Sequence, residues 1–220
     1  MFDLWAHQWR QRHGQGDVRL IRYVDDIVVG FEKRQDAEQF LKAVPQRFAA
    51  FGLELHPVKT HLRAFGRYAR ERRQKRGLGK PESFNFLGFT HVCGQWKTGT
   101  FRVERRTIAQ RMRAKIAEVK AELRRRQQHP IPRQGTWLRT VLLGHYRYYG
   151  VPLNGKALQR FRTEVTRLWH RSLSRRSQKG YVTWTRMNRY VDKWLPAARI
   201  YHPHPQERFG VMTSGRSPVR

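Results

Sequence analysis

Apolar positions recur at helical spacing through the second half of the chain. In residues 104–128 they form one stripe, which predicts an amphipathic helix; the stripe is Ile108, Met112, Ile116, Val119 and Leu123. The same spacing predicts further helices at 136–149, 155–176 and 183–195, after the linker His129–Gly135. Residues 202–220 lack this pattern and are expected to form a mobile tail.

The first half of the chain mixes two spacings. Residues 3–13 and 35–51 have helical spacing, and Pro45 should kink or split the second helix. Short β-rich runs at 20–23 and 27–31 predict a tight hairpin with Val24, Asp25 and Asp26 at its tip.

The segments that follow predict a second β-rich unit. It runs from Phe84 to Val103 with a turn at Thr98-Gly99. Leu53–Leu55 and Leu62–Phe65 are candidate short strands, and the polar stretch 66–83 is expected to be an exposed loop. The predicted fold class is therefore α+β, with antiparallel hairpins and a helix in residues 1–103, an all-helical region in 104–200 and a flexible tail in 201–220.

The charge of the chain predicts a polyanionic partner. Its 220 residues include 46 Lys and Arg against 16 Asp and Glu, a formal net charge of +30. A compact state of this charge repels itself unless a polyanion such as nucleic acid is near. No apolar run approaches the length of a membrane span and no signal-peptide pattern opens the sequence, so we expect a soluble cytoplasmic protein. Cys93 is the only cysteine, which excludes an internal disulfide and a multi-cysteine zinc module.

Asp25 and Asp26 are the candidate catalytic pair. Two adjacent carboxylates in front of apolar strands are costly unless a cation compensates them. Mg²⁺ prefers a few carboxylates together with water and phosphate oxygens. Beside a polyanion-binding surface, the pair suggests nucleotidyl transfer assisted by two metal ions. The alternative is that both residues are ordinary turn residues, a position for which Asp is well suited.

Four motifs, in order along residues 18–150, resemble group II intron reverse transcriptases, also called maturases. Tyr23-Val24-Asp25-Asp26 resembles the Tyr-x-Asp-Asp box of reverse transcriptases. Leu55–Thr60 is similar to the segment after the palm helix, and Phe84–Phe89 to the primer-grip strand. Leu138–Tyr149 resembles the maturase-specific region. The resemblance implies a partial polymerase palm followed by a helical thumb and maturase region.

The resemblance also implies roles for individual residues. Asp25 and Asp26 would hold catalytic Mg²⁺, and Tyr23 would lie under the primer end. Lys59 would help a departing pyrophosphate, or is a solvated turn lysine. Phe86, Leu87 and Gly88 would form the primer grip, with Gly88 allowing close backbone approach; a buried strand would use Phe86 and Leu87 in the same way.

Basic and aromatic residues of the second half are candidates for binding nucleic acid. At helical spacing, four cations line up beside the apolar stripe: Arg106, Arg113, Lys120 and Arg124. They favour a phosphate-tracking surface over a simply solvated face. Arg147, Tyr148 and Tyr149 offer stacking surfaces for unpaired bases, although some of these rings are expected in the core. His202 and His204 are spaced like metal ligands but have no supporting cysteine or acid, which favours a structural role over zinc binding.

A polymerase site of this type needs another carboxylate from an earlier strand. Only Asp3 and Asp17 precede the box, and neither matches the family's upstream motif. The sequence therefore resembles a C-terminal half that does not polymerise alone and works with a complementing N-terminal polymerase half. Its expected partners are intron RNA and an RNA/DNA primer–template duplex. The alternative is a non-catalytic, basic RNA-binding splicing cofactor that retains the polymerase scaffold.

Overall fold

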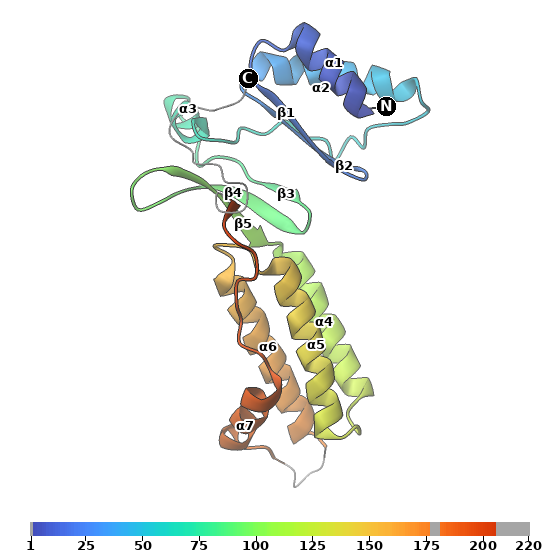
Figure 1. Ribbon diagram of the computed structural model, residues 1–220, viewed down its shortest axis with the longest axis vertical. Coiled ribbons are helices and arrows are strands. Elements are labelled where there is room, and N and C mark those ends of the chain that lie inside the picture. The colour runs from blue at the N-terminus through green and yellow to red at the C-terminus, as the bar shows by residue number, and fades with distance from the viewer. Residues whose placement is uncertain (1, 177–180, 206–220) are drawn as a thin grey trace. The chain divides into compact units, whose positions relative to one another are not determined.

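The chain forms two compact units, residues 1–87 and residues 88–220, which we describe separately. The computed structural model describes residues 2–176 and 181–205 (Figure 1). It is an α+β fold, as predicted. The elements of the first unit are α1 (Phe2–His13), β1 (Val18–Tyr23), β2 (Asp26–Phe31), α2 (Arg34–Ala49), α3 (Ala69–Lys75) and β3 (Phe84–Phe86). Those of the second are β4 (Phe89–Gln95), β5 (Phe101–Thr107), α4 (Ala109–Arg125), α5 (Ile131–Tyr149), α6 (Gly155–Ser174) and α7 (Trp184–Trp194).

In the first unit, helices α1 and α2 pack on one face of the β1–β2 hairpin. The strands pair antiparallel from Val18–Phe31 to Tyr23–Asp26. Because side chains alternate along a strand, Leu20, Val29 and Phe31 share the face that packs against the helices. The buried centre of this small core consists of Ala6, Trp9, Phe40 and Val44.

A buried carboxylate fixes the connection between α1 and β1. Asp36, in the first turn of α2, is fully buried, and its Oδ2 accepts hydrogen bonds from the backbone N–H groups of Gln15 (2.9 Å) and Gly16 (3.0 Å). Two turn donors therefore lose no hydrogen bond when they leave water. The start of the hairpin is held against α2 as a result.

Three predictions for the first unit are wrong, the last of them only in part. The segments Leu53–Leu55 and Leu62–Phe65 are not strands, because Leu53 and Leu62 are exposed and neither segment pairs with a strand in the part of the chain that the structure describes. The stretch 66–83 is not a simple loop, since it contains α3, where Lys75 pairs with Glu71 one turn away at 2.8 Å. The prediction for Pro45 is wrong in part: the helix is not split, because α2 is continuous from Arg34 to Ala49, while a kink at Pro45 stays a prediction.

The second unit begins with a β-hairpin. Strands β4 and β5 pair antiparallel from Phe89–Thr107 to Gln95–Phe101. The predicted turn is confirmed, and Gly99 there has a positive φ of 82°. Strand β5 continues to Thr107, so α4 begins at Ala109 rather than at residue 104. Glu104 explains the extension, because it bonds Arg102 and Arg106, the neighbours that share its face of the strand.

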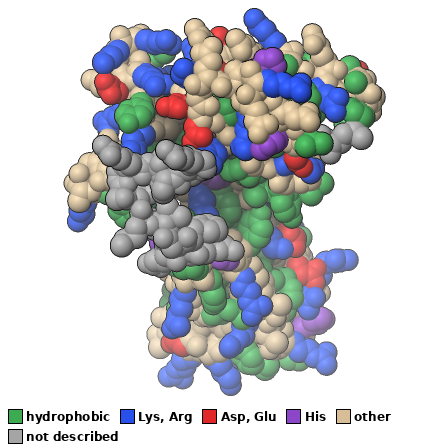
Figure 2. Space-filling model, turned by 45° about the horizontal axis from the view of Figure 1, so that its top comes forward, with side chains coloured by type: hydrophobic (Ala, Val, Ile, Leu, Met, Phe, Trp, Pro, Cys, Tyr) green, Lys and Arg blue, Asp and Glu red, His purple; other side chains and the backbone are tan. Residues whose placement is uncertain are grey.

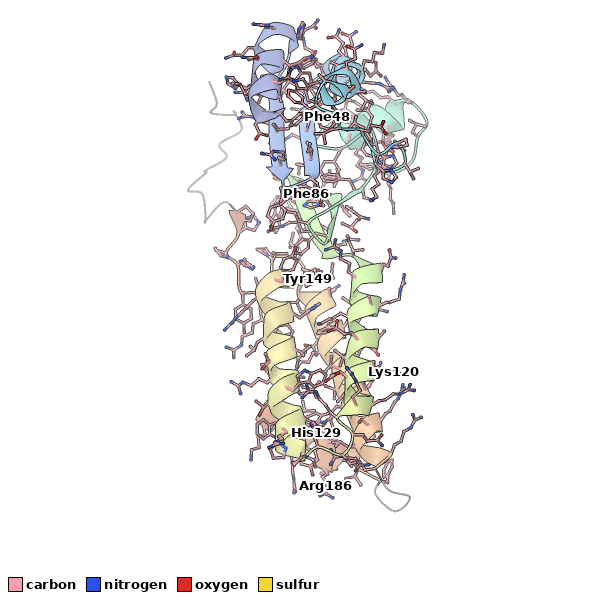
Figure 3. All side chains as sticks on the ribbon, turned by 90° about the vertical axis from the view of Figure 1, so that its right-hand side faces the viewer. Phe48, Phe86, Lys120, His129, Tyr149 and Arg186 are labelled. Atoms are coloured by element: carbon pink, nitrogen blue, oxygen red, sulfur yellow. The ribbon has the colours of Figure 1, made fainter. Side chains whose placement is uncertain are left out.

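Helices α4, α5 and α6 lie side by side, with α7 near one end of them (Figures 1 and 3). Most of their core is apolar. The fully buried exception is Gln134, whose Oε1 accepts from Trp169 Nε1 at 2.9 Å and whose Nε2 donates to the carbonyl of Arg126. The largest buried side chains are Trp169, Tyr146, Phe161, Leu123, Leu138, Leu142, Leu158 and Met187. Helix α5 starts at Ile131, so most of the segment expected to be a linker belongs to its first turns.

The segment after α7 returns along the bundle. Arg162 donates to the carbonyl of Pro196 at 3.0 Å, and the backbone N–H groups of Tyr201 and His202 donate to Gly150 at 2.8 and 3.0 Å. The His202 Nε2 lies 2.6 Å from the carbonyl oxygen of Arg147. Tyr201 and His202, at the start of the predicted mobile tail, are thus bonded to the bundle. The rest of that prediction, 206–220, lies outside the described residues.

Among the described helices, none is long and apolar enough to cross a membrane.

Candidate functional site

The aspartate pair lies at the tip of the β1–β2 hairpin. Strand β1 ends at Tyr23 and β2 starts at Asp26, so the loop is only Val24 and Asp25. Val24 has φ 57°, a left-handed conformation that a β-branched residue rarely adopts. Such a conformation costs about 1–2 kcal/mol and persists only where the surrounding structure enforces it. The tight loop therefore presents Asp25 on a strained backbone.

The two faces of the hairpin differ. Leu20 and Arg22 share the face that packs against α1 and α2, whereas Tyr23 and its partner Asp26 share the opposite face. On that outer face Ile21 is 57% exposed and Tyr23 61% exposed. A side chain at Gly30, also on this face, would meet only the carbonyl of Arg19 at 3.9 Å. The outer face is thus exposed and partly apolar beside two exposed carboxylates.

Arg22 ties this tip to helix α1. Its Nε donates to Asp3 Oδ1 at 2.8 Å and its Nη2 to Asp3 Oδ2 at 2.7 Å, while Nη1 donates to the Val24 carbonyl at 3.3 Å. The hydrogen bonds from Arg22 lower the pKa of Asp3. Asp3 is therefore engaged in holding the loop. No sequence pattern predicted this pair, because its members lie on different elements.

Asp25 and Asp26 are the residues predicted to hold Mg²⁺, and that role stays a prediction. A single Mg²⁺ ion takes one or two carboxylates and completes its octahedron with water and phosphate oxygens. Within residues 2–176 and 181–205, no group of three or more His, Cys, Asp or Glu side chains is placed to hold a metal. Asp25 and Asp26 are adjacent and exposed, so their carboxylates supply the oxygen ligands that such an ion prefers.

Lys59 lies on a separate turn between α2 and α3. The carbonyl of His56 accepts the N–H groups of Lys59 and Thr60 at 3.1 and 3.0 Å, which closes the turn. The Lys59 side chain is exposed. Its predicted role in pyrophosphate release stays a prediction.

The predicted primer grip is a tight turn. Leu87 and Gly88 have φ angles of 46° and 79°, and two consecutive positive values are typical of a type I′ hairpin turn. A Cβ on Gly88 would lie 3.2 Å from Tyr149 Oη and 3.3 Å from Arg111 Nη1. Protein side chains therefore fill the space beside the Gly88 backbone. Whether Phe86 and its neighbours contact a primer stays a prediction.

Tyr148 and Tyr149 pack next to this turn within the second unit. Tyr148 stacks on Phe89 with centroids 6.0 Å apart and planes at 9°, and Tyr149 meets Phe89 edge-on at 5.3 Å. The buried Asn154 fixes the arrangement, because its Nδ2 donates to the Tyr149 carbonyl and to Thr107 Oγ1, both at 2.8 Å. Tyr148 and Arg147 are exposed, and Tyr149, labelled in Figure 3, is partly buried.

The predicted basic ridge is shorter than expected. Arg113, Lys120 and Arg124 are exposed on α4, and Figure 3 labels Lys120 on that helix. Arg106 does not belong to the ridge, because it lies on strand β5 and pairs with Glu104 at 2.6 Å. Figure 2 shows Lys and Arg side chains spread widely over the face drawn, with few acidic ones between them.

Comparison with known families finds a match for the first part of the chain. Residues 1–91 match the family model described as reverse transcriptase (RNA-dependent DNA polymerase). This region includes the hairpin with Asp25 and Asp26, the Lys59 turn and the turn at Leu87-Gly88. The resemblance to reverse transcriptases is thereby confirmed for these residues, and nucleic acid is the partner class that it implies. No curated protein matched the chain.

Proposed function

We propose that this chain is a fragment of a group II intron reverse transcriptase with maturase activity. The observation that carries the proposal is the exposed Asp25-Asp26 tip on a strained hairpin inside the region that matches reverse transcriptases. The order of the later motifs, Phe84–Phe89 and then Leu138–Tyr149, supports the group II assignment. The net charge of +30 supports a nucleic-acid partner.

In this proposal Asp25 and Asp26 hold Mg²⁺. The ion would lower the pKa of the primer 3′-hydroxyl and neutralise charge on the departing pyrophosphate. Tyr23 and Asp26 share the outer face of the hairpin, where Gly30 leaves room for a sugar-phosphate strand. The exposed Ile21 offers apolar contact to the same strand. Arg22 and Asp3 hold the loop in position while the nucleic-acid strand is bound.

The remaining predicted residues hold the nucleic acid. Arg113, Lys120 and Arg124 follow phosphates of the primer–template duplex, and Arg147, Tyr148 and Tyr149 contact intron RNA. Phe86, Leu87 and Gly88 support the primer end, and Lys59 is a cation for pyrophosphate. In this role the protein would work in the cytoplasm and help the intron to fold, splice and move.

We further propose that this chain does not polymerise alone. A two-ion site needs more carboxylates than Asp25 and Asp26, and the described residues offer no cluster of three ligands. A complementing polymerase half would supply the missing carboxylate. The lack of a three-ligand cluster among the described residues also favours a second candidate function. In that case the protein is a non-catalytic RNA-binding splicing cofactor that keeps the polymerase scaffold.

A primer-extension assay with RNA template, deoxynucleotides and Mg²⁺ tests the proposal. We expect no extension by the chain alone, and extension abolished by Asp25→Ala when a complementing half is added. Robust extension by the chain alone would refute the claim of incompleteness. The double variant Asp25→Asn, Asp26→Asn separates the two functions, since a metal site loses Mg²⁺-dependent affinity for primer ends. If the protein only binds RNA, the double variant should change this affinity only as much as the altered surface charge explains.

A further inference from the structure

Helices α4 and α5 enclose a groove within the second unit. Its volume is about 400 Å³, which lies within the range of small-ligand sites. One wall comes from α4 and consists of Arg111, Ala114, Lys115 and Glu118. The other comes from α5 and includes Gly144, His145 and Tyr148. Tyr149 also lines the groove, and apart from Tyr148 and Tyr149 none of the lining residues was singled out from the sequence as a binding residue.

Gly144 is the most informative residue of the groove. It lies in the interior of α5 and is exposed, and a Cβ built on it would meet no atom within 4 Å. Glycine weakens a helix interior relative to alanine, so its presence calls for a reason. Elsewhere on α5 the reason is packing, because a Cβ on Gly135 would lie 2.4 Å from Trp194. At Gly144 the protein supplies no such neighbour, which favours close approach by a ligand.

The ring of Tyr148 provides a stacking surface beside the exposed backbone of Gly144. It follows Gly144 by one helical turn, and helical side chains lean toward the N-terminus, so its ring lies over the Gly144 side of α5. Stacking on Phe89 at 6.0 Å holds the ring in place. Half of the Tyr148 surface is exposed. A held, half-exposed ring is the kind of surface on which a nucleobase stacks.

The facing wall carries positive charge. Arg111 and Lys115 are one turn apart on α4, with the exposed, small side chain of Ala114 next to Lys115. Lys115 pairs at 2.7 Å with Glu118, which also lines the groove, so the net positive charge of this wall comes from Arg111, which has no ion pair within the described ranges. Two cations beside a small residue fit a phosphate and its sugar better than they fit an apolar ligand.

His145 adds an unsatisfied polar atom to the groove. The residue is 7% exposed, and its buried Nε2 has no hydrogen-bond partner among the residues described. Its ring stacks on Phe161 with centroids 3.8 Å apart, so the imidazole is fixed. Buried polar atoms without partners are few in folded proteins. A ligand hydroxyl or base edge would give this nitrogen a partner.

We infer that this groove seats one nucleotide of a single-stranded nucleic acid. Arg111 and Lys115 hold its phosphate, its sugar passes over Gly144 and Ala114, and its base stacks on Tyr148. A duplex presents two convex backbones and suits the exposed ridge of α4, whereas a concave groove of this size suits one unpaired nucleotide. The inference rests on the proposed nucleic-acid function, since it specifies where that partner is held.

Gly144→Ala tests the inference because it separates folding from binding. The new methyl group has room, so the melting temperature should rise by about 2 °C or more. The same methyl group should obstruct the strand and weaken binding of a fluorescent uridine oligonucleotide by about fivefold or more, as measured by fluorescence anisotropy. Affinity unchanged from wild type would overturn the inference, whatever happens to the melting temperature.

A matched pair of arginine variants controls for charge. Arg111→Gln and Arg125→Gln remove the same charge from α4, but Arg125 lies outside the groove and is exposed. We expect Arg111→Gln to weaken oligonucleotide binding clearly more than Arg125→Gln; equal effects would contradict the groove. If wild type binds no oligonucleotide, the proposed function fails too. If it binds with steep salt dependence while Gly144→Ala and Arg111→Gln match the control, only the groove fails.

Discussion

The carboxylate of Asp3 and the guanidinium of Arg22 form a two-point ion pair, with oxygen–nitrogen distances of 2.8 and 2.7 Å. Arg22 also donates to the carbonyl of Val24 at 3.3 Å. Helix α1 is thus connected through one arginine to the loop that carries Asp25. Since Val24 is in a strained conformation, this connection bears on how the carboxylate pair is presented.

Asp3→Asn should loosen the loop and weaken metal binding by about threefold while leaving the melting temperature almost unchanged, because exposed ion pairs add little stability. Mn²⁺ binding followed by electron paramagnetic resonance measures the affinity. Asp17→Asn is the matched control, as it removes one carboxylate from another ion pair of β1, Asp17–Arg19 at 3.0 Å. Equal Mn²⁺ affinities in the two variants would show that the Asp3 contact does not position the loop.

Val24→Gly should stabilise the hairpin. Glycine adopts a φ of 57° without strain, and Val24 is 73% exposed, so little packing is lost. Relief of about 1–2 kcal/mol of strain, less the greater entropy of unfolded glycine, leaves a gain of about 0.5–1 kcal/mol. Urea denaturation measures it, with Val24→Ile as a control that keeps the strain. A glycine variant less stable than the isoleucine variant would contradict the strain argument.

Spacing alone predicted most of the fold because each large element buries one face. The hairpin around Asp25 and the helices of the second unit followed from apolar periods of two and of three to four. Helix α3 was missed because it has no apolar stripe; the spacing of Glu71 and Lys75 was the available signal. The extent of β5 was missed because Ile108 continued the helical spacing, while Glu104 between two arginines fitted a strand.

The candidate site was predictable only in part. Asp25 and Asp26 stood out because acids at an apolar hairpin are unusual, and the structure puts both at the exposed tip. Their support by Asp3 depends on which face of β1 meets α1, which spacing does not give. The role of Gly144 could not be predicted from the sequence either, because it depends on which atoms surround this glycine. Contacts between elements far apart in sequence are fixed by tertiary packing, and one sequence carries little direct sign of them.

The ridge of α4 should contribute to the salt dependence of duplex binding. Replacing Arg113, Lys120 and Arg124 together by Gln removes about three phosphate contacts and should lower the slope of log affinity against log salt by about 2–3. The control removes the same charge from exposed residues of α6, as Lys156→Gln, Arg160→Gln and Arg171→Gln. Equal slopes in the two triple variants would mean that only net charge matters.

Gln134→Ala should destabilise the helical unit by about 2–3 kcal/mol, because it leaves the buried Trp169 indole and the Arg126 carbonyl after α4 without partners. Chemical denaturation followed by tryptophan fluorescence measures the change. Gln128→Ala, at an exposed position, is the control and should change stability little. Similar losses in both variants would show that the Gln134 hydrogen bonds do not stabilise the bundle.

Titration of His145 should contribute to the pH dependence of stability. Burial, with a smaller effect from the charge of Lys115, lowers the pKa of His145 from 6.5 to about 4. Between these two values the unfolded chain binds a proton that the folded chain does not, so stability falls as pH decreases from 6.5 toward 4 and levels off below. At about 1.4 kcal/mol per pKa unit, the loss is at most about 3.5 kcal/mol. Denaturation of wild type and His145→Phe across this range measures it, since phenylalanine keeps a ring against Phe161 but does not titrate. The variant should lose less stability than wild type, and parallel curves would show that His145 does not contribute.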